Sequence, residues 1–436
     1  MSSRVYDVLI VGAGPAGACV AIEAALGGAR VLLAEQKRFP RAKLCGEFIS
    51  PECLSHFARL GVMGRMLEAG GREVVETRFY TRGGRCVGVP SEWFERAGVE
   101  GLGGASARGA LGLSRAEMDA ALLARAREVG VEVLEEAQAV GLWLEKGRVC
   151  GARLRVSDER ELVREREARE VRARVTIDAT GRTRALARLL EREARQGDES
   201  RSSIRRAPLV AFKAHLEGAR GEEGSCEIYF YGGGYGGLSP VEGGLSNLCF
   251  IASASDVRAR GSDAERVLRE VVRTNRRAEE TLRDARISSE WLSVALEGFG
   301  RRGLVPAAGL VAVGDAASFI DPFTGSGMLM ALESGTLAAE ALARWLARLR
   351  SADESRDAED FGRAFEGFAE EYRARYDARF GARLRLCSWL RRAAFAPPAV
   401  SEAAMMLLGA SDGVRRRLAR ATRGRSGEGL PFGVGR

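Results

Sequence analysis

The sequence predicts an α/β fold in three parts: a domain built on a parallel sheet, a domain built on an antiparallel sheet, and a helical C-terminal region. The 436-residue chain opens with a β-α-β unit, in which apolar strands over Tyr6–Val11 and Arg30–Ala34 flank an alanine-rich helix over Ala18–Leu26. Residues 208–252 hold short strands broken by glycine clusters, which is typical of an antiparallel sheet. Aromatic side chains recur at helical spacing over 361–387 and predict one long helix.

Two further regions complete the predicted outline. Residues 114–129 predict an amphipathic helix, because Ser114 can cap its first turn and Glu117 stands at the capping-box position. Short apolar strands are predicted over Leu304–Pro306 and Leu310–Val313.

The composition excludes several classes of protein and site. Eight Cys residues are scattered without a C-x-x-C pair and only two His residues are present, so no metal site is expected. These cysteines are typical of buried thiols in a reducing cytoplasm, where we expect the protein to reside. The net charge is +8, but no nucleic-acid-binding signature accompanies it, so no nucleic-acid partner is expected. No apolar run reaches the length of a transmembrane helix.

A glycine-rich loop follows the first strand. Gly12 permits its tight turn, Gly14 lets the backbone approach a diphosphate, and Gly17 lets the next helix pack closely on the strand. The N-terminus of that helix then faces the anion. Glu35 ends the second strand, where a carboxylate accepts hydrogen bonds from a ribose diol. The predicted nucleotide-binding residues are Gly12, Ala13, Gly14, Pro15, Ala16, Gly17, Glu35 and the adjoining Gln36.

A second motif, V-A-V-G-D-A-A-S-F-I-D-P-F-T-G-S-G, lies far along the chain at 311–327. The carboxylate of Asp315, at the end of a buried strand, suits a ribityl hydroxyl. Pro322 and the glycines after it begin a helix whose free N–H groups would point at a flavin and stabilise its anionic reduced form. The predicted contacts are Gly314, Asp315, Pro322, Gly325, Ser326 and Gly327. Together the two motifs predict FAD.

This pair of motifs resembles a flavoprotein superfamily that includes para-hydroxybenzoate hydroxylase-type monooxygenases, flavin-dependent halogenases and geranylgeranyl reductases. The resemblance covers roughly residues 5–345. It implies non-covalently bound FAD in a Rossmann-like domain of the glutathione reductase type, with an antiparallel sheet that caps the flavin. The expected bounds are 1–70, 106–200 and 303–345 for the FAD-binding domain, 71–105 and 201–302 for the substrate or cap domain, and 346–436 for the helical region.

Residues 39–46, F-P-R-A-K-L-C-G, resemble the P-R-x-K-x-C-G segment of geranylgeranyl reductases. By that resemblance Arg41 meets the FAD diphosphate, and Cys45 and Gly46 lie beside the flavin ring. The continuation over 46–51 also resembles the G-E-x-x-x-P of halogenases. Halogenation is disfavoured, because the chain has no Lys between positions 44 and 145 and no W-x-W-x-I-P motif.

Three more segments carry the resemblance. Arg115 lies on a helix that contacts FAD in the superfamily, and the backbone of Ala139 falls near the adenine. Thr180-Gly181 stands where aromatic hydroxylases have Asp-Gly, which weighs against aromatic hydroxylation and against direct use of NAD(P)H. The segment Y-G-G-L-S-P over 235–240 resembles the Y-x-W-x-F-P of geranylgeranyl reductases but lacks its two large side chains.

The sequence therefore predicts hydride transfer between flavin and an apolar lipid, isoprenoid or polyketide-like substrate, in C=C reduction or dehydrogenation. Cys45, His56 and Tyr235 are the candidate proton donors, and NAD(P)H is the candidate electron donor. Two alternatives stay open: an FAD monooxygenase that hydroxylates an aromatic or polyketide substrate, and a flavin-binding protein without turnover. The Arg-rich tail over 415–425 is a candidate contact with anionic lipid at a membrane surface.

Overall fold

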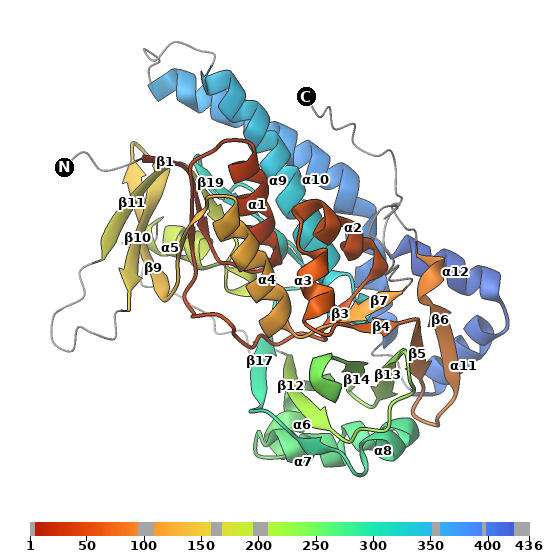
Figure 1. The fold of residues 1–436 in the computed structure, drawn as a ribbon. Coiled ribbons are helices and arrows are strands. Elements are labelled where there is room, and N and C mark those ends of the chain that lie inside the picture. The colour runs from red at the N-terminus through yellow and green to blue at the C-terminus, as the bar shows by residue number, and fades with distance from the viewer. Residues whose placement is uncertain are drawn as a thin grey trace.

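The structure is a computed structural model that describes residues 5–94, 109–157, 168–194, 208–350, 358–394 and 398–422. Two sheet-based bodies lie one above the other in Figure 1, and the last helices run along one flank and end beside the lower body. The expected α/β class, with a helical C-terminal region, is confirmed.

The first sheet contains the β-α-β unit that opens the chain. Its strands are β1 (Val5–Val11), β2 (Val31–Ala34), β8 (Glu132–Leu134), β9 (Ala137–Glu145), β10 (Arg148–Val156), β11 (Arg169–Asp178) and β19 (Leu310–Ala312). They run in the order β8-β2-β1-β11-β10-β9, with β19 beside β11. β1 is parallel to both β2 and β11, and β19 is parallel to β11. The carboxyl ends of these parallel strands therefore meet at one edge, where nucleotides bind in such sheets.

Helices cover the first sheet, with α1 packed between two others. They are α1 (Pro15–Leu26), α2 (Pro51–Leu60), α3 (Met63–Glu68), α4 (Arg115–Glu128), α5 (Ala185–Ala194) and α9 (Gly327–Arg350). α1 is buried on nearly all sides, because its small apolar residues let α9 and α4 approach. A Cβ at Gly335 of α9 would lie 2.8 Å from the backbone oxygen of Ala16 on α1, so only glycine fits that contact.

The second sheet, here called the cap sheet, has eight strands. They are β5 (Glu76–Tyr80), β6 (Cys86–Pro90), β12 (Leu209–Glu217), β13 (Ser225–Tyr231), β14 (Gly234–Pro240), β15 (Ser246–Ser253), β16 (Arg286–Ile287) and β17 (Leu292–Leu296). All pairs are antiparallel except β5 with β13. The short helices α6 (Ala254–Ala259), α7 (Ala264–Glu270) and α8 (Arg276–Leu282) cover one face (Figure 1), which leaves the other for the site.

The C-terminal region consists of α10 (Ala358–Ala394), α11 (Pro398–Gly409) and α12 (Asp412–Ala421). The expected aromatic stripe exists on α10, which packs against α9 through buried rings such as Phe368 and Tyr372. α11 and α12 then lie against β6 of the cap sheet. Two small sheets complete the fold: β3 (Phe48–Ile49), β7 (Ala110–Gly112) and β4 (Arg72–Val74) form one, and β18 (Gly300–Arg301) pairs with β20 (Ser318–Phe319) in the other.

Two predicted elements differ in the structure. The first helix begins at Pro15 rather than Ala18. The first N–H groups of a helix have no acceptor within the helix, so proline, which has no N–H, is well suited to the first position. The strand expected over Leu304–Pro306 is absent. Pro306 has no N–H to donate to a neighbouring strand. Over these three residues a single carbonyl, that of Leu304, accepts a strand hydrogen bond, from the Ala312 N–H of β19 at 2.8 Å.

Candidate functional site

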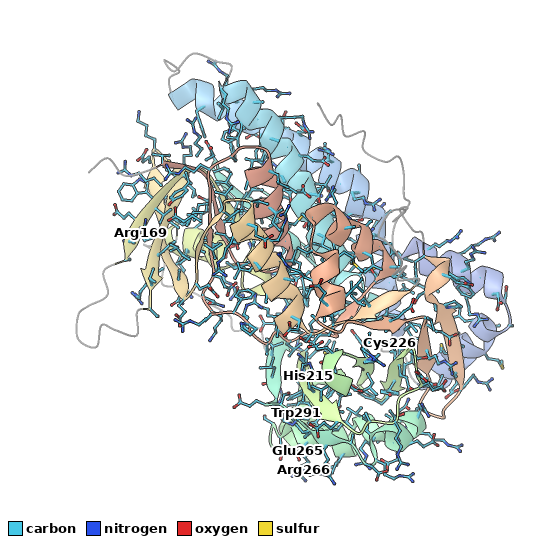
Figure 2. All side chains as sticks on the ribbon, viewed as in Figure 1. Arg169, His215, Cys226, Glu265, Arg266 and Trp291 are labelled. Carbon is cyan, nitrogen blue, oxygen red and sulfur yellow. The ribbon has the colours of Figure 1, made fainter. Side chains whose placement is uncertain are left out.

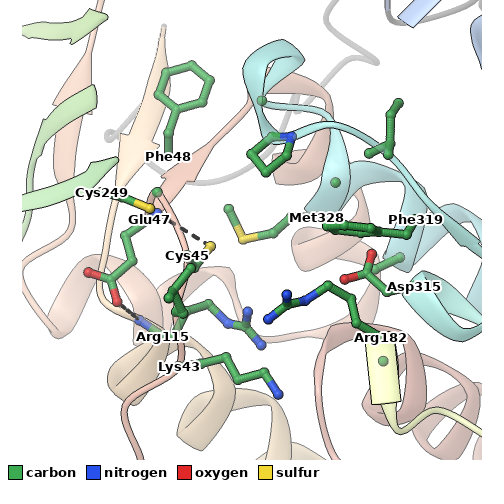
Figure 3. Close-up of a pocket in the computed structure, with 18 of the residues that line it drawn as sticks. Lys43, Cys45, Glu47, Phe48, Arg115, Arg182, Cys249, Asp315, Phe319 and Met328 are labelled. Carbon is green, nitrogen blue, oxygen red and sulfur yellow. Dashed lines mark hydrogen bonds between the residues drawn. The ribbon is translucent and has the colours of Figure 1, made fainter. Parts of the chain in front are cut away.

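A cavity of about 640 Å³ lies between the first sheet and the cap sheet. One half is bordered by the loops that follow β1, β2 and β19, and the other by the cap sheet and α10–α12. Part of the wall is drawn in Figure 3. The predicted site residues that line the cavity are Gly12, Gly14, Pro15, Ala16, Glu35, Gln36, Arg41, Cys45, Gly46, Arg115, Ala139, Tyr235, Gly314, Asp315, Pro322, Gly325 and Gly327.

The glycine loop after β1 shapes the polar half of the cavity. Gly12 has φ +105°, and a Cβ there would lie 2.4 Å from the backbone oxygen of Ala179, so glycine is required. Gly17 was predicted to contact the cofactor, but it packs behind the wall, where a Cβ would lie 1.9 Å from the Gly12 oxygen. Above Gly14 the space is open, because the nearest atom to a Cβ there is Arg115 Nη2 at 3.7 Å.

Glu35 directly follows β2 and faces the same half of the cavity. Its Oε2 accepts the Ala13 N–H at 2.9 Å, and its Oε1 accepts the Lys37 N–H at 3.1 Å. Ala13 does not line the cavity, and its backbone N–H instead holds this carboxylate in place. Gln36 and Ala139 line the cavity beside it, where a nucleotide ribose and base would lie.

Five cations line the polar half of the cavity: Lys37, Arg41, Lys43, Arg115 and Arg182. Burial lowers the pKa of Lys43, and the guanidinium groups of Arg115 and Arg41 lower it further. Burial likewise lowers the pKa of Arg182. Only part of this charge is neutralised, chiefly by Asp119, whose Oδ2 lies 2.8 Å from Arg41 Nη1 and 2.7 Å from Arg115 Nη2. Among these cations Arg115 is buried, Arg41 and Arg182 are part-buried, and Lys43 is exposed where it lines the cavity. A cluster of like charges of this kind is stabilised by an anionic ligand.

The second motif closes the polar half from the side of α9. Asp315 follows β19 on a short 3-10 turn, and burial raises the pKa of its carboxyl group while Arg182, Arg115 and Lys43 act in the opposite direction. Gly325, in the left-handed region at φ 60°, leads into the N-terminus of α9 at the cavity. Ser326 was predicted as a contact, but it is fully buried and does not line the cavity.

These features fit FAD. The N-termini of α1 and α9 both face the cavity and present free N–H groups and partial positive charge. A clear space above Gly14, beside the cation cluster, suits the diphosphate. Glu35 suits the ribose and Asp315 the ribityl chain, so one ligand with all three groups would meet every polar feature of this half.

The other half of the cavity is apolar. Cross-strand partners on β12, β15 and β14 (Lys213, Cys249 and Gly237) share one face of the cap sheet, and that face turns to the cavity. Apolar side chains from the sheet and from the C-terminal helices meet across it, namely Phe79, Val89, Ile228, Leu390, Met405 and Leu408. The C-terminal region thus forms part of the site.

The three candidate proton donors lie in different places. The Cys45 side chain borders the cavity, and its sulfur accepts the Glu47 N–H at 3.4 Å (Figure 3). Tyr235 also lines the cavity, but its hydroxyl donates to Asp321 Oδ1, and burial raises the pKa of Tyr235 well above its ordinary value.

His56 lies on α2 and does not line the cavity. Its Nδ1 lies 3.2 Å from Arg59 Nη2, and it interacts electrostatically with Glu333 of α9 and Arg379 of α10. Its role as a proton donor to substrate stays a prediction.

We expect His56 to make the fold sensitive to mild acid. Burial, and then Arg59, lower the pKa of His56 to about 4 from an ordinary 6.5. Between these values the unfolded chain carries a proton on His56 that the native chain lacks, so the free energy of unfolding falls as the pH falls through this window. The loss is about 3 kcal/mol. In a His56→Asn variant, urea titrations across the window should show a shallower pH dependence, and equal slopes for both proteins would contradict the assignment.

Sequence reasoning missed several residues of the site. Lys43 and Arg182 each adjoin a predicted motif, and their charge was the available signal. Glu47 and Lys213 meet across 166 residues, with Lys213 Nζ 2.5 Å from Glu47 Oε1. No local pattern could show that contact, although Lys213 is one of few lysines in the chain.

Neither a metal centre nor a membrane span is found in the described ranges. No group of three or more His, Cys, Asp or Glu side chains there is placed to hold a metal ion. None of the helices in those ranges is both long and apolar enough to cross a bilayer.

Comparisons with known proteins identify an FAD-binding domain in this chain. Residues 5–357 match the FAD binding domain family. A menaquinone reductase of Mycobacterium tuberculosis is 29% identical over 355 residues, which cover 79% of this chain and 78% of the relative. A digeranylgeranylglycerophospholipid reductase of Methanosarcina mazei is 30% identical over 343 residues, which cover 77% of this chain and 74% of the relative.

Solved structures show the same fold. The flavin-dependent brominase Bmp2 superposes with a TM-score of 0.72 at 18% identity, covering 97% of this chain and 95% of that one. A geranylgeranyl bacteriochlorophyll reductase-like protein of Thermoplasma acidophilum gives a TM-score of 0.70 at 21% identity, covering 97% of both chains. At these identities the likeness concerns the fold and not the reaction.

Proposed function

This chain is an FAD-dependent oxidoreductase that belongs to the FAD binding domain family, and from that premise we propose that it reduces an apolar isoprenoid or quinone-type substrate. The observation that carries the proposal is the apolar half of the cavity, which opens directly onto the polar half. The names of the two reductases support the same substrate class.

When bound, FAD supplies a carrier that accepts and donates hydride. The residues of this chain bind and orient it. Arg41, Lys43 and Arg115, with the N-terminus of α1, would hold the diphosphate, and Glu35 and Asp315 would hold the two sugar-like parts, because all of them line the polar half of the cavity. The N-terminus of α9 favours negative charge on the ring. The apolar half excludes water and positions the carbon that is reduced.

Cys45 is the proton donor that the site supports best. Its sulfur borders the cavity and accepts the Glu47 N–H, and it interacts electrostatically with the Arg115 guanidinium. These two contacts hold the sulfur at the cavity wall. Tyr235 is less suited, because its proton is already donated to Asp321.

Anaerobic stopped-flow spectroscopy tests the proposal. NADPH, NADH or dithionite would first reduce the flavin, and the reduced protein would then meet menaquinone or a geranylgeranyl lipid. We expect flavin reoxidation and a saturated or quinol product without oxygen. Oxygen-dependent hydroxylation of the substrate with a hydroperoxide spectrum would instead establish a monooxygenase, and a flavin that no donor reduces would indicate a protein without turnover.

The C-terminal helices support a contact with a membrane surface. Met406 and Leu407 of α11 are 55% and 71% exposed, and Trp389 of α10 is 61% exposed. The neighbours of the first two in sequence, Met405 and Leu408, line the cavity, so α11 joins an exposed apolar surface to the substrate half. An apolar substrate could pass from a bilayer to the site along this helix.

The arginines of the tail divide into two groups. Arg415 donates to the Gly88 carbonyl and Arg420 to the Trp93 carbonyl, so these two hold α12 on the cap domain. Arg416 and Arg417 are exposed and free to meet lipid phosphates. Arginines 423 and 425 lie outside the described residues.

A Met406→Asp/Leu407→Asp double variant should lose membrane binding. In co-sedimentation with phosphatidylglycerol vesicles we expect its bound fraction to fall about tenfold, because two exposed apolar side chains become charged. Leu144→Asp, at an exposed apolar position on β9, is the matched control and should bind as the wild type does. Equal binding of the double variant and the control would contradict this contact.

A further inference from the structure

Glu47 is a buried carboxylate that joins the first domain to the cap sheet. It is fully buried and has φ 53°, a backbone conformation that residues with side chains rarely adopt. Its Oε1 accepts the Arg115 N–H at 2.9 Å and lies 2.5 Å from Lys213 Nζ, and its Oε2 lies 2.6 Å from His215 Nε2. Three donors from α4 and β12 therefore meet at one carboxylate.

The cluster has an outer and an inner end. The outer end is His215, whose side chain is 18% exposed, whereas that of Lys213 is 3% exposed; His215 lies on the cap domain (Figure 2). At the inner end, Lys213 is the cross-strand partner of Cys249 on the face that turns to the cavity. Figure 3 shows Cys249, Glu47 and Cys45 together at the cavity wall.

The charges around the cluster hold Glu47 as a carboxylate between its two basic neighbours, His215 and Lys213. Burial alone would raise the pKa of Glu47, but the hydrogen bond with His215 and the Lys213 ammonium outweigh it and lower that pKa. Cys249 interacts electrostatically with Cys45, Lys213 and Glu47. The titratable and charged groups that face the cluster are Cys45 from its own loop, Arg115 from α4, Lys213 and His215 from β12, Cys249 from β15, and Arg182 from the turn after β11.

We propose that His215, Glu47 and Lys213 form a proton path from solvent to the Cys45–Cys249 thiol pair at the cavity wall. The inference rests on the proposed reductase function, in which the substrate C=C bond gains a hydride and a proton. Cys45 gives its thiol proton to the substrate carbon. Its thiolate then takes the Cys249 proton as Cys249 takes one from Lys213.

His215 gives a proton to Glu47 Oε2, and the carboxyl group turns so that this proton faces Lys213 Nζ. Glu47 returns to the carboxylate as Lys213 is reprotonated, and His215 takes a proton from water. Every S–H, O–H or N–H bond that breaks is matched by one that forms, so the path moves one proton inward and no electrons. The electrons come from the donor that reduces the flavin, which is a nicotinamide or dithionite in the experiments above.

Thiol reactivity tests the coupling without any turnover. Alkylation of Cys45 by iodoacetamide, followed by peptide mass spectrometry over a range of pH, reports the fraction of thiolate. Glu47→Gln leaves the Lys213 ammonium unbalanced, so we expect Cys45 to react about tenfold faster at mildly acidic pH. Glu217→Gln, on the same strand but exposed, should react as the wild type does. An unchanged Cys45 profile in folded Glu47→Gln protein would overturn the coupling.

Chemical rescue tests the path itself. His215→Ala should keep its FAD but turn over about 100-fold more slowly, because proton delivery is interrupted. Added imidazole should restore much of the rate, since the lost side chain is part-exposed, whereas a purely structural loss would not respond. Turnover at the wild-type rate, or a slow rate that imidazole leaves unchanged, would overturn the path. If the wild type reduces no substrate, the proposed function fails instead, and the alkylation result still decides the coupling.

Discussion

Gly14→Glu is expected to yield a folded, colourless protein. Gly14 has φ −75° and ψ −178°, a conformation open to any residue, and a Cβ there meets nothing closer than Arg115 Nη2 at 3.7 Å. The new carboxylate would enter the space assigned to the diphosphate, pair with Arg115, and repel the anion from the α1 N-terminus. We expect the affinity for FAD to fall at least about 1000-fold, or about 4 kcal/mol.

The measurement is the flavin content of the purified variant, followed by titration with FAD. Gly64→Glu is the matched control, because Gly64 is exposed and a Cβ there has no neighbour within 4 Å. It should keep the flavin content of the wild type. A Gly14→Glu protein that binds FAD as well as this control would contradict the placement of the diphosphate.

Gly237→Trp is expected to slow substrate turnover strongly while the flavin stays bound. The geranylgeranyl reductase segment that 235–240 resembles has a Trp here together with a Phe two residues later, whereas this chain has Gly237, which lines the cavity, together with Ser239. Gly237 lies on the cavity face of β14, where a Cβ would lie 2.9 Å from Ile228 Cδ1, a methyl group that can move aside. The indole would then fill the apolar half, between the cap sheet and the C-terminal helices. Because even a small displacement of substrate costs about 100-fold, we expect turnover to fall by at least about that factor.

Turnover of menaquinone and of a geranylgeranyl lipid, with the flavin content measured in parallel, tests this prediction. Gly232→Trp is the matched control: Gly232 is exposed in the turn before β14, and a Cβ there has no neighbour within 4 Å. Substrate turnover in Gly237→Trp equal to that of the control would show that the substrate does not occupy this half of the cavity.

The polar half of the site could be predicted from sequence because its chemistry is local. The Gly12 turn, the N-terminus of α1 and the carboxylate of Glu35 belong to one β-α-β unit, and each residue type is required by its own backbone or by the ligand. Asp315 and Gly325 likewise belong to one short segment, the loop that leads into the start of α9, far along the chain. The carboxyl ends of parallel strands bring the two motifs together.

The apolar half could not be predicted, because it depends on contacts between distant segments. The pairing of Lys213 with Cys249 sets which residues of the cap sheet face the cavity, and that register is not encoded by either strand alone. Leu390 and Met405 come from helices that had no assigned role in the site. His56 shows the same limit, since a short helix does not reveal which of its neighbours it will face.

The central claim is that one FAD sits non-covalently between the motifs at Gly12–Gly17 and Gly314–Gly327. The most direct measurement is to denature the purified wild-type protein, separate the supernatant by chromatography, and quantify the released flavin against protein. We predict about one FAD per chain, all of it in the supernatant. A protein that purifies without flavin and takes up none when FAD is added, or that carries only FMN, would contradict the account.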